Sequence, residues 1–207
     1  MQTSKVTFSN DGGLELAGLL DLPEGRPRAF ALFAHCFTCS KNLKAANNIA
    51  RSLAASGFGV LRFDFTGLGQ SEGEFADSTF SANVADLLAA VRFLDREYEA
   101  PALLVGHSLG GTAVLQAAPS IESARAVVTI GSPAEPAHVR HLFADAEAAL
   151  EADGEAEVSL GGRPFRIRQA FVDDLERHDL PAAIGGLRKA LLVLSLIHIS
   201  EPTRLDA

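Results

Sequence analysis

The feature that most constrains the fold is a glycine-rich turn, Gly106-His107-Ser108-Leu109-Gly110-Gly111, between two apolar segments. Residues 102–105 before it form a short apolar run typical of a buried strand, and residues 109–118 after it have the length of a helix. Small residues two positions before and two positions after Ser108 allow a strand and a helix to pass close together. The motif therefore predicts a sharp strand-to-helix turn that presents the Ser108 hydroxyl.

The same alternation recurs along the chain. Further short apolar runs bounded by Gly, Pro or Asp cover residues 29–34, 59–63, 126–130 and 190–194. Between them, apolar side chains recur at helical spacing in two segments: Ala46, Ile49, Ala50 and Leu53, then Val84, Leu87, Leu88, Val91 and Leu94. Alternating strands and helices predict an α/β fold with a mostly parallel, doubly wound sheet.

Two regions depart from this alternation. Residues 5–8 and 14–20 flank the turn-forming cluster Asn10-Asp11-Gly12-Gly13, which predicts an N-terminal antiparallel hairpin. Residues 134–187 are rich in Ala and Glu and contain Gly161-Gly162-Arg163-Pro164, so we interpret them as an insertion. An insertion on the side of an open sheet where ligands enter is expected to form a lid.

Composition narrows the classes of function. The 207 residues are 47% hydrophobic with a net charge of -8 and no basic cluster, which favours one domain, residues 1–194, and argues against nucleic-acid binding. Lys5, Asp11 and Glu15 interrupt the N-terminal segment, which therefore predicts neither a signal peptide nor a membrane span. We expect a cytoplasmic protein with a small-molecule partner, and the oligomeric state stays open.

A glycine-punctuated loop, Asp64-Phe65-Thr66-Gly67-Leu68-Gly69-Gln70-Ser71, follows the predicted strand at 59–63. It lacks the Lys-Ser/Thr pair of a P-loop and the GxGxxG pattern of a dinucleotide site, so nucleotide binding is not expected. We interpret the loop as a tight turn in which the side chains of Asp64 and Ser71 hydrogen-bond to nearby backbone groups.

Three loops that each follow a predicted strand, HCFTCSKN, DFTGLGQSEG and GHSLGG, together resemble the α/β-hydrolase superfamily near its serine aminopeptidase and esterase-like branch. The resemblance runs from about Lys5 to Leu194. The first loop is similar to that of hydrolase domains that precede an OsmC-like domain in some bacterial proteins. The resemblance implies an α/β-hydrolase fold and cleavage of ester or amide bonds through an acyl-Ser108 intermediate, with neither cofactor nor metal.

The resemblance also implies roles for individual residues. Ser108 is the expected nucleophile, because a weak hydroxyl nucleophile needs this exposed turn together with a base and oxyanion donors. The backbone N–H groups of Phe37 and Leu109 are the expected oxyanion hole, and the positive end of the following helix adds to it. His35, just before that loop, is then expected to fix the backbone by hydrogen bonds rather than to act as a base.

The carboxyl end departs from the family pattern. In α/β-hydrolases an acid follows a late strand and a histidine follows the last one, yet after residues 190–194 only residues 195–207 remain. We expect the final strand and helix to be lacking, an unpaired sheet edge, and little activity without a base. The stretch LIHISEPTR resembles a translated sequencing adapter, so residues 195–207 are interpreted as a non-native tail and the chain as a truncated member.

Substitutes for the missing acid and base can be named. Glu135 is the candidate acid because some hydrolases place it after the strand at 126–130, and Glu201 and Asp206 are weaker candidates. His198 is the candidate base because it follows the last strand. The other candidates lack the expected context: His138, His141 and His178 in the insertion, and His107 in the turn.

Two other functions stay open. One is a non-catalytic α/β-hydrolase-like module that binds a ligand through the lid. The other is thiol redox chemistry at Cys36-Phe37-Thr38-Cys39, since a C-x-x-C motif between a strand and a helix also occurs in thioredoxin-like proteins. Two thiols alone do not complete a metal site. With only two cysteines the chain has no disulfide framework as the source of its stability, which fits a reducing compartment. Three aromatic residues of the insertion are interpreted as lid core rather than as acyl-selecting groups: Phe143, Phe165 and Phe171.

Overall fold

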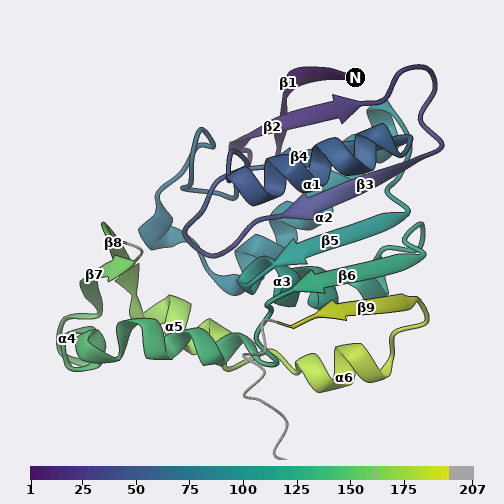
Figure 1. Ribbon diagram of the computed structural model, residues 1–207. Helices are drawn as coiled ribbons and strands as arrows, with labels where there is room; N and C mark the ends of the chain where they lie inside the picture. The colour runs from purple at the N-terminus through teal and green to yellow at the C-terminus, as the bar shows by residue number, and fades with distance from the viewer. Residues whose placement is uncertain (161, 196–207) are drawn as a thin grey trace, which may run out of the picture.

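The computed structural model describes residues 1–160 and 162–195, and its centre is a seven-stranded sheet in the order β1-β2-β4-β3-β5-β6-β9 (Figure 1). Every pair from β4 to β9 is parallel, whereas β2 is antiparallel to β1 and to β4. The predicted mostly parallel sheet is therefore confirmed. Its strands are β1 (Gln2–Ser9), β2 (Glu15–Leu22), β3 (Ala29–Ala34), β4 (Phe58–Phe63), β5 (Leu103–His107), β6 (Ala126–Ile130) and β9 (Ala190–Leu194).

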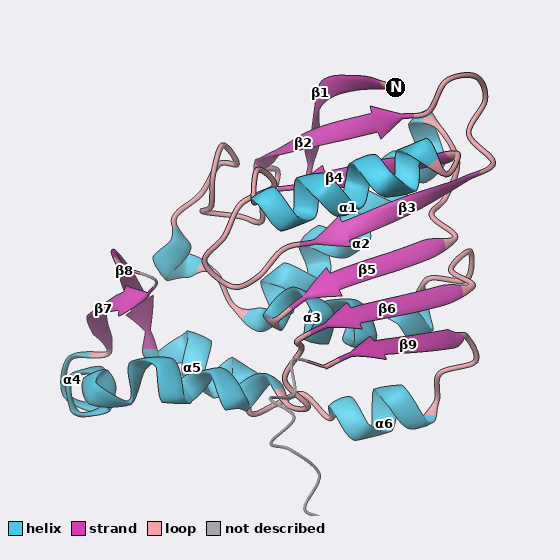
Figure 2. Cartoon of the chain, in the orientation of Figure 1, coloured by secondary structure: helices cyan, strands magenta, loops and turns pink. Residues whose placement is uncertain are grey.

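Helices cover both faces of this sheet (Figure 2). One face packs on α1 (Lys44–Ala55), and the other on α2 (Phe80–Glu97) and α3 (Leu109–Ala117). Short 3-10 turns follow β4 and α3, namely η1 (Phe75–Asp77) and η2 (Ala118–Ser120). None of the helices in the described ranges has the length and hydropathy needed to cross a bilayer.

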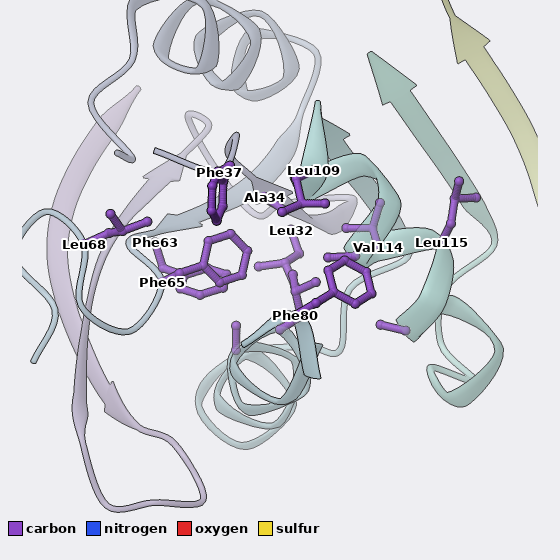
Figure 3. Packing of buried hydrophobic residues seen from close by; sticks show 14 of the residues in the cluster. Leu32, Ala34, Phe37, Phe63, Phe65, Leu68, Phe80, Leu109, Val114 and Leu115 are labelled. Atoms are coloured by element: carbon purple, nitrogen blue, oxygen red, sulfur yellow. The ribbon is translucent and has the colours of Figure 1, made fainter. Parts of the chain in front are cut away.

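The central strand β3 shows why the sequence of these strands is continuously apolar. Ala31 and Phe33 pack toward α1, while Leu32 and Ala34 belong to the main core with α2 and α3 (Figure 3). Successive side chains of a strand point to opposite faces, so a strand that is covered on both faces needs apolar residues at every position.

The N-terminal hairpin is confirmed, with longer strands than the sequence predicts. β1 and β2 pair in register from Gln2↔Leu22 to Ser9↔Glu15. The Asn10 side chain accepts hydrogen bonds from the N–H groups of Gly12 and Leu14, both at 3.0 Å, and so closes the turn. The strand ends are not predicted because the exposed face of the outer strand carries polar residues, which give no apolar run in the sequence.

Between β6 and β9 the chain leaves the sheet. Residues 136–175, here called the insertion, form η3 (Pro136–Ala146), α4 (Glu147–Asp153), the strands β7 (Glu155–Leu160) and β8 (Arg163–Arg168), and α5 (Gln169–Leu175). β7 and β8 pair only with each other, and the insertion lies where the arrowheads of the parallel strands point (Figure 1). The next helix, α6 (Leu180–Gly185), packs against α3, so this part of the predicted 134–187 insertion belongs to the helical layer on the sheet and not to the lid.

Strand β9 is the edge of the sheet within the described residues. It pairs with β6 alone, and no strand or helix follows it up to Ser195. Its apolar side chains are exposed by 40–60%: Leu191, Leu192, Val193 and Leu194. An exposed apolar edge strand offers both unpaired backbone groups and hydrophobic area to another chain.

We predict that replacing Leu192 and Val193 with Lys reduces self-association of this chain. Charges on an edge strand oppose pairing, and the association threshold should rise about tenfold, which corresponds to about 1.4 kcal/mol of lost association energy. Light scattering over a concentration series measures the threshold. Ile184→Lys, an exposed apolar position outside the sheet, is the control and should not reproduce the gain. A wild-type chain that stays monomeric throughout would contradict the prediction.

Candidate active site

Ser108 stands at the junction of β5 and α3 in a strained backbone conformation. Its φ is 53° and its ψ is -129°, and it is the only non-glycine residue with positive φ in residues 1–160 and 162–195. Such a conformation costs on the order of 1–3 kcal/mol and persists only where the surrounding structure enforces it. Its N–H donates to the Ile130 carbonyl at 2.9 Å, which ties the turn to β6. The predicted sharp turn at Ser108 is confirmed.

Glycines on both sides of Ser108 allow backbone to pack on backbone. A Cβ at Gly106 would lie 2.4 Å from the Gly111 Cα, so β5 and α3 cross at a distance that excludes any side chain. A Cβ at Gly110 would lie 2.2 Å from the His35 carbonyl oxygen. The start of α3 therefore presses directly on the loop that follows β3.

This loop, residues 35–41, is the predicted oxyanion loop. β3 pairs with β5 in parallel, with Ala34 opposite Gly106, so the ends of both strands deliver their loops to the same place. Within the described residues, neither the Phe37 N–H nor the Leu109 N–H donates to a protein acceptor. An oxyanion hole needs such unpaired donors, and the role of these two N–H groups stays a prediction.

The far end of the loop is fixed by a buried carboxylate. Asp64 is fully buried and accepts hydrogen bonds from the Lys41 N–H at 2.6 Å, from the Gln70 N–H at 2.9 Å, and from the Lys41 ammonium. Ser71 Oγ donates to the Asp64 carbonyl at 2.5 Å. The interpretation of this stretch as a turn held by Asp64 and Ser71 is confirmed, and the turn also anchors the oxyanion loop.

A second buried ion pair, between Arg62 and Asp21, also holds the end of this loop. Arg62 Nε lies 2.9 Å from Asp21 Oδ2, and Arg62 Nη1 donates to the Lys41 carbonyl at 2.6 Å. Buried charges are tolerated only when they are paired and hydrogen-bonded. Asp86 holds the other side of the turn by accepting from the Thr66 N–H at 2.8 Å, and its burial raises the pKa of its carboxyl.

His35 is buried between these groups. Its Nδ1 lies 2.8 Å from the Cys36 carbonyl oxygen, while its Nε2 is 3.9 Å from Asp64 Oδ1, beyond hydrogen-bond distance. Burial is the largest influence on the ring, and it lowers the pKa of His35 below its ordinary value. The contact of the His35 ring with the Cys36 carbonyl agrees with the predicted hydrogen bond to the loop backbone, and the absence of a role as base stays a prediction.

Ser108 lines a cavity of about 390 Å³ beside the insertion. His138 and His141 of η3 line the same cavity, as does Ser195, the residue that follows β9. The sequence places both histidines in the insertion but cannot place them beside Ser108, because that contact depends on how η3 folds back over the sheet. No three His, Cys, Asp or Glu side chains in the described ranges gather into a group that could hold a metal ion.

The other predicted site residues lie elsewhere. Glu135 is exposed and lines a different cavity, together with residues of the α5–α6 connection. His198, Glu201 and Asp206 lie outside the described residues. His178 lies 3.0 Å from Ser81 Oγ at the start of α2. These candidates for acid and base therefore stay predictions.

The aromatic residues of the insertion form a core above the oxyanion loop. The Phe37 ring stacks on Phe171 with 4.9 Å between centroids, and it also contacts Phe75 at 5.3 Å. Phe143 and Phe171 are 3% and 2% exposed, and Phe165 packs on Phe75 at 4.7 Å. The interpretation of these residues as packing groups is confirmed.

Residues 25–151 match the model of the family described as serine aminopeptidase, S33. This stretch includes the oxyanion loop, the Asp64 turn and Ser108, and it covers more than half of the chain. The chain belongs to this family. The predicted resemblance and the α/β-hydrolase fold are thereby confirmed, and a thioredoxin-like fold is excluded.

Relatives of this S33 member include hydrolases. The chain is 32% identical over 130 residues to the mouse mitochondrial palmitoyl-protein thioesterase ABHD10, covering 60% of the chain, and 35% identical over 98 residues to rat monoglyceride lipase, covering 46%. It spans 43% and 32% of their lengths. The esterase domain of a Rhodothermus marinus protein is 52% identical, with a TM-score of 0.73 over 93% of this chain and 75% of that one.

We predict that Gly110→Ala destabilises the fold by about 1–3 kcal/mol, the usual cost of overpacking a close contact. The added methyl group would press on the His35 carbonyl and push α3 away from the oxyanion loop. Urea unfolding measures the change. Gly185→Ala is the matched control, because a Cβ there meets nothing within 4 Å. Equal stability of the two variants would show that the backbone contact at Gly110 is not enforced.

Proposed function

We propose that this S33 family member is a serine hydrolase that cleaves ester bonds of a small-molecule substrate through an acyl-Ser108 intermediate. The observation that carries the proposal is the strained turn at Ser108, at the end of the sheet to which the parallel strands β3 and β5 deliver two backbone N–H groups, of Phe37 and Leu109, that have no acceptor among the described residues. A fold stores strain of this kind where a side chain must be presented to a ligand.

The geometry suggests the following steps. Ser108 Oγ attacks the carbonyl carbon of the ester, and the carbonyl oxygen gains a negative charge in the tetrahedral intermediate. The N–H groups of Phe37 and Leu109 stabilise that charge. The alcohol leaves, and water then attacks the acyl-enzyme to release the acid. Neither step requires a cofactor.

The proton transfers need a base and an acid. By the chain order of the fold these groups follow the late strands, and Ser195, directly after β9, already lines the Ser108 cavity. We propose that the complete triad takes its acid and histidine from the chain beyond β9, with Glu135 and His198 as the substitutes that this sequence offers. Loss of the base in a serine triad lowers turnover about a million-fold and leaves roughly 10³–10⁴-fold over water.

The bond class rests on the relatives. A thioesterase and a lipase among the curated matches, and an esterase domain among the solved structures, support esters or thioesters rather than amides as substrates. Phe37 and Phe171 pack on each other in the apolar core of the insertion and do not line the cavity. We therefore propose that the residues lining the cavity select the acyl group. We propose that the insertion acts as a lid over this cavity.

We predict that a fluorophosphonate probe labels Ser108. Ser108 Oγ forms a bond to phosphorus, the P–F bond breaks and fluoride leaves, and the hydroxyl proton passes to the triad base or, more slowly, to water, while the oxyanion hole stabilises the charge on the phosphoryl oxygen. Labelling is followed by intact-protein mass spectrometry, and the modified peptide is identified after digestion. Ser108→Ala should abolish it. Ser120→Ala is the control, because it removes an exposed hydroxyl at the opposite end of the same helical segment.

The alternatives give different results. Labelling that persists in Ser108→Ala would overturn the assignment of the nucleophile. No labelling of the wild-type chain would favour a non-catalytic binding module. Reduction of a small disulfide substrate by the protein, blocked when thiol reagents alkylate the two cysteines, would favour redox chemistry at Cys36 and Cys39.

A further inference from the structure

The carbonyl oxygen of Cys36 is held by two donors. His35 Nδ1 lies 2.8 Å from it, and the Cys39 N–H donates to it across a tight turn at 3.2 Å. Because a carbonyl oxygen only accepts hydrogen bonds, the proton of the neutral His35 ring is on Nδ1. His35 is 1% exposed, so little competing water reaches this hydrogen bond.

A covalent bond closes the same turn. Cys36 and Cys39 form a disulfide with 5.3 Å between their Cα atoms, within the usual range for a bridge. Phe37 and Thr38 are the two residues between the bridged positions. A bridge across so short a loop removes little entropy from the unfolded chain, so its contribution to global stability is small. Its consequence is local, because it fixes the conformation of the turn.

The orientation of the Cys36–Phe37 peptide follows from these contacts. The peptide group is planar and trans, so the Phe37 N–H points away from the Cys36 carbonyl oxygen. We propose that His35 and the Cys36–Cys39 bridge are positioning groups that aim the Phe37 N–H at the oxyanion, and that reducing the bridge weakens the oxyanion hole. The inference rests on the function proposed above for Ser108 and Phe37.

Other contacts keep the loop in place when the bridge opens. The Phe37 ring is buried and stacked on Phe171, Arg163 donates to the Thr38 carbonyl, and Lys41 is bound to Asp64. Reduction therefore releases the Cys36–Phe37 peptide without unfolding the loop. The result is a graded loss of oxyanion stabilisation, in a protein that remains folded.

The redox step needs only an external dithiol. Its thiolate attacks one sulfur of the bridge, the Cys36–Cys39 S–S bond breaks, and a mixed disulfide forms. The second thiol of the reagent then displaces the remaining cysteine. Two electrons pass from the dithiol, which becomes a disulfide, to Cys36 and Cys39, which each end as a thiol with one proton. Both cysteines are half-buried, so the reagent can reach them.

We predict that His35→Leu slows fluorophosphonate labelling of Ser108 at least about tenfold, whereas His35→Asn retains most of the rate. Removing one oxyanion donor costs about 10²–10³ in rate, and a misdirected donor costs part of that. Asn places an N–H donor near the position of Nδ1, and Leu places none. A merely structural role would leave both variants equally impaired, and that result would overturn the assignment of His35.

The bridge is tested with a dithiol and with Cys36→Ser/Cys39→Ser. Reduction of the wild-type chain should slow fluorophosphonate labelling of Ser108 several-fold, and reoxidation with glutathione disulfide should restore the rate. The double variant should label at the reduced rate and ignore both reagents. Mass spectrometry of alkylated samples gives the redox state in each assay. Equal rates for the oxidised chain, the reduced chain and the double variant would overturn the role of the bridge.

A readout without activity separates this inference from the proposed function. In protein labelled with ¹⁵N-Phe, the Phe37 amide signal, assigned by its loss in Phe37→Leu, should move in His35→Leu and on reduction but not in His35→Asn. If the amide responds in this way while Ser108 is never labelled, the proposed function fails and the positioning role stands. If Ser108 is labelled and neither rate nor amide signal responds, the positioning role fails and the proposed function stands.

Discussion

The contact of backbone with backbone at the start of α3 is the constraint on which the rest of the site depends. At Gly106 the strand β5 approaches α3, and at Gly110 the same helix touches the carbonyl of His35. Because no side chain separates these segments, Ser108 and residues 35–41, the proposed nucleophile and oxyanion loop, are parts of one rigid junction. The strain at Ser108 is maintained by this junction and by the hydrogen bond of its N–H to β6.

Behind the junction lies a layer of buried charge. Asp64 and Asp21 are fully buried. Asp64 is paired with Lys41, which lies in the loop itself, and Asp21 is paired with Arg62, which lies in β4 and donates to the Lys41 carbonyl. Removing one partner of such a pair leaves an uncompensated buried charge, so the network tolerates little rearrangement. It therefore supplies a fixed support for residues 35–41, while the hydrophobic contacts of Phe37 connect the loop to the insertion.

The insertion and the end of β9 complete the surroundings of Ser108. Two histidines of η3 and Ser195 line its cavity, so groups far apart in the sequence meet at the carboxyl ends of the parallel strands. Open α/β sheets bind ligands at this edge. The cavity beside Ser108 lies at this edge, where the proposed substrate would enter.

The sequence alone determined the sheet, the hairpin, the turn at Ser108 and the Asp64 turn, because each has a local signal: apolar runs, glycines at fixed spacing, and side chains that bond to their own loops. The sequence did not show that Glu135 lines a different cavity from Ser108, or that His138 and His141 line the same cavity as Ser108. Both placements depend on how the insertion packs. Nor could spacing show that His35 and Cys39 share the Cys36 carbonyl as acceptor. Such contacts are set by the direction of single hydrogen bonds, which only the tertiary structure decided.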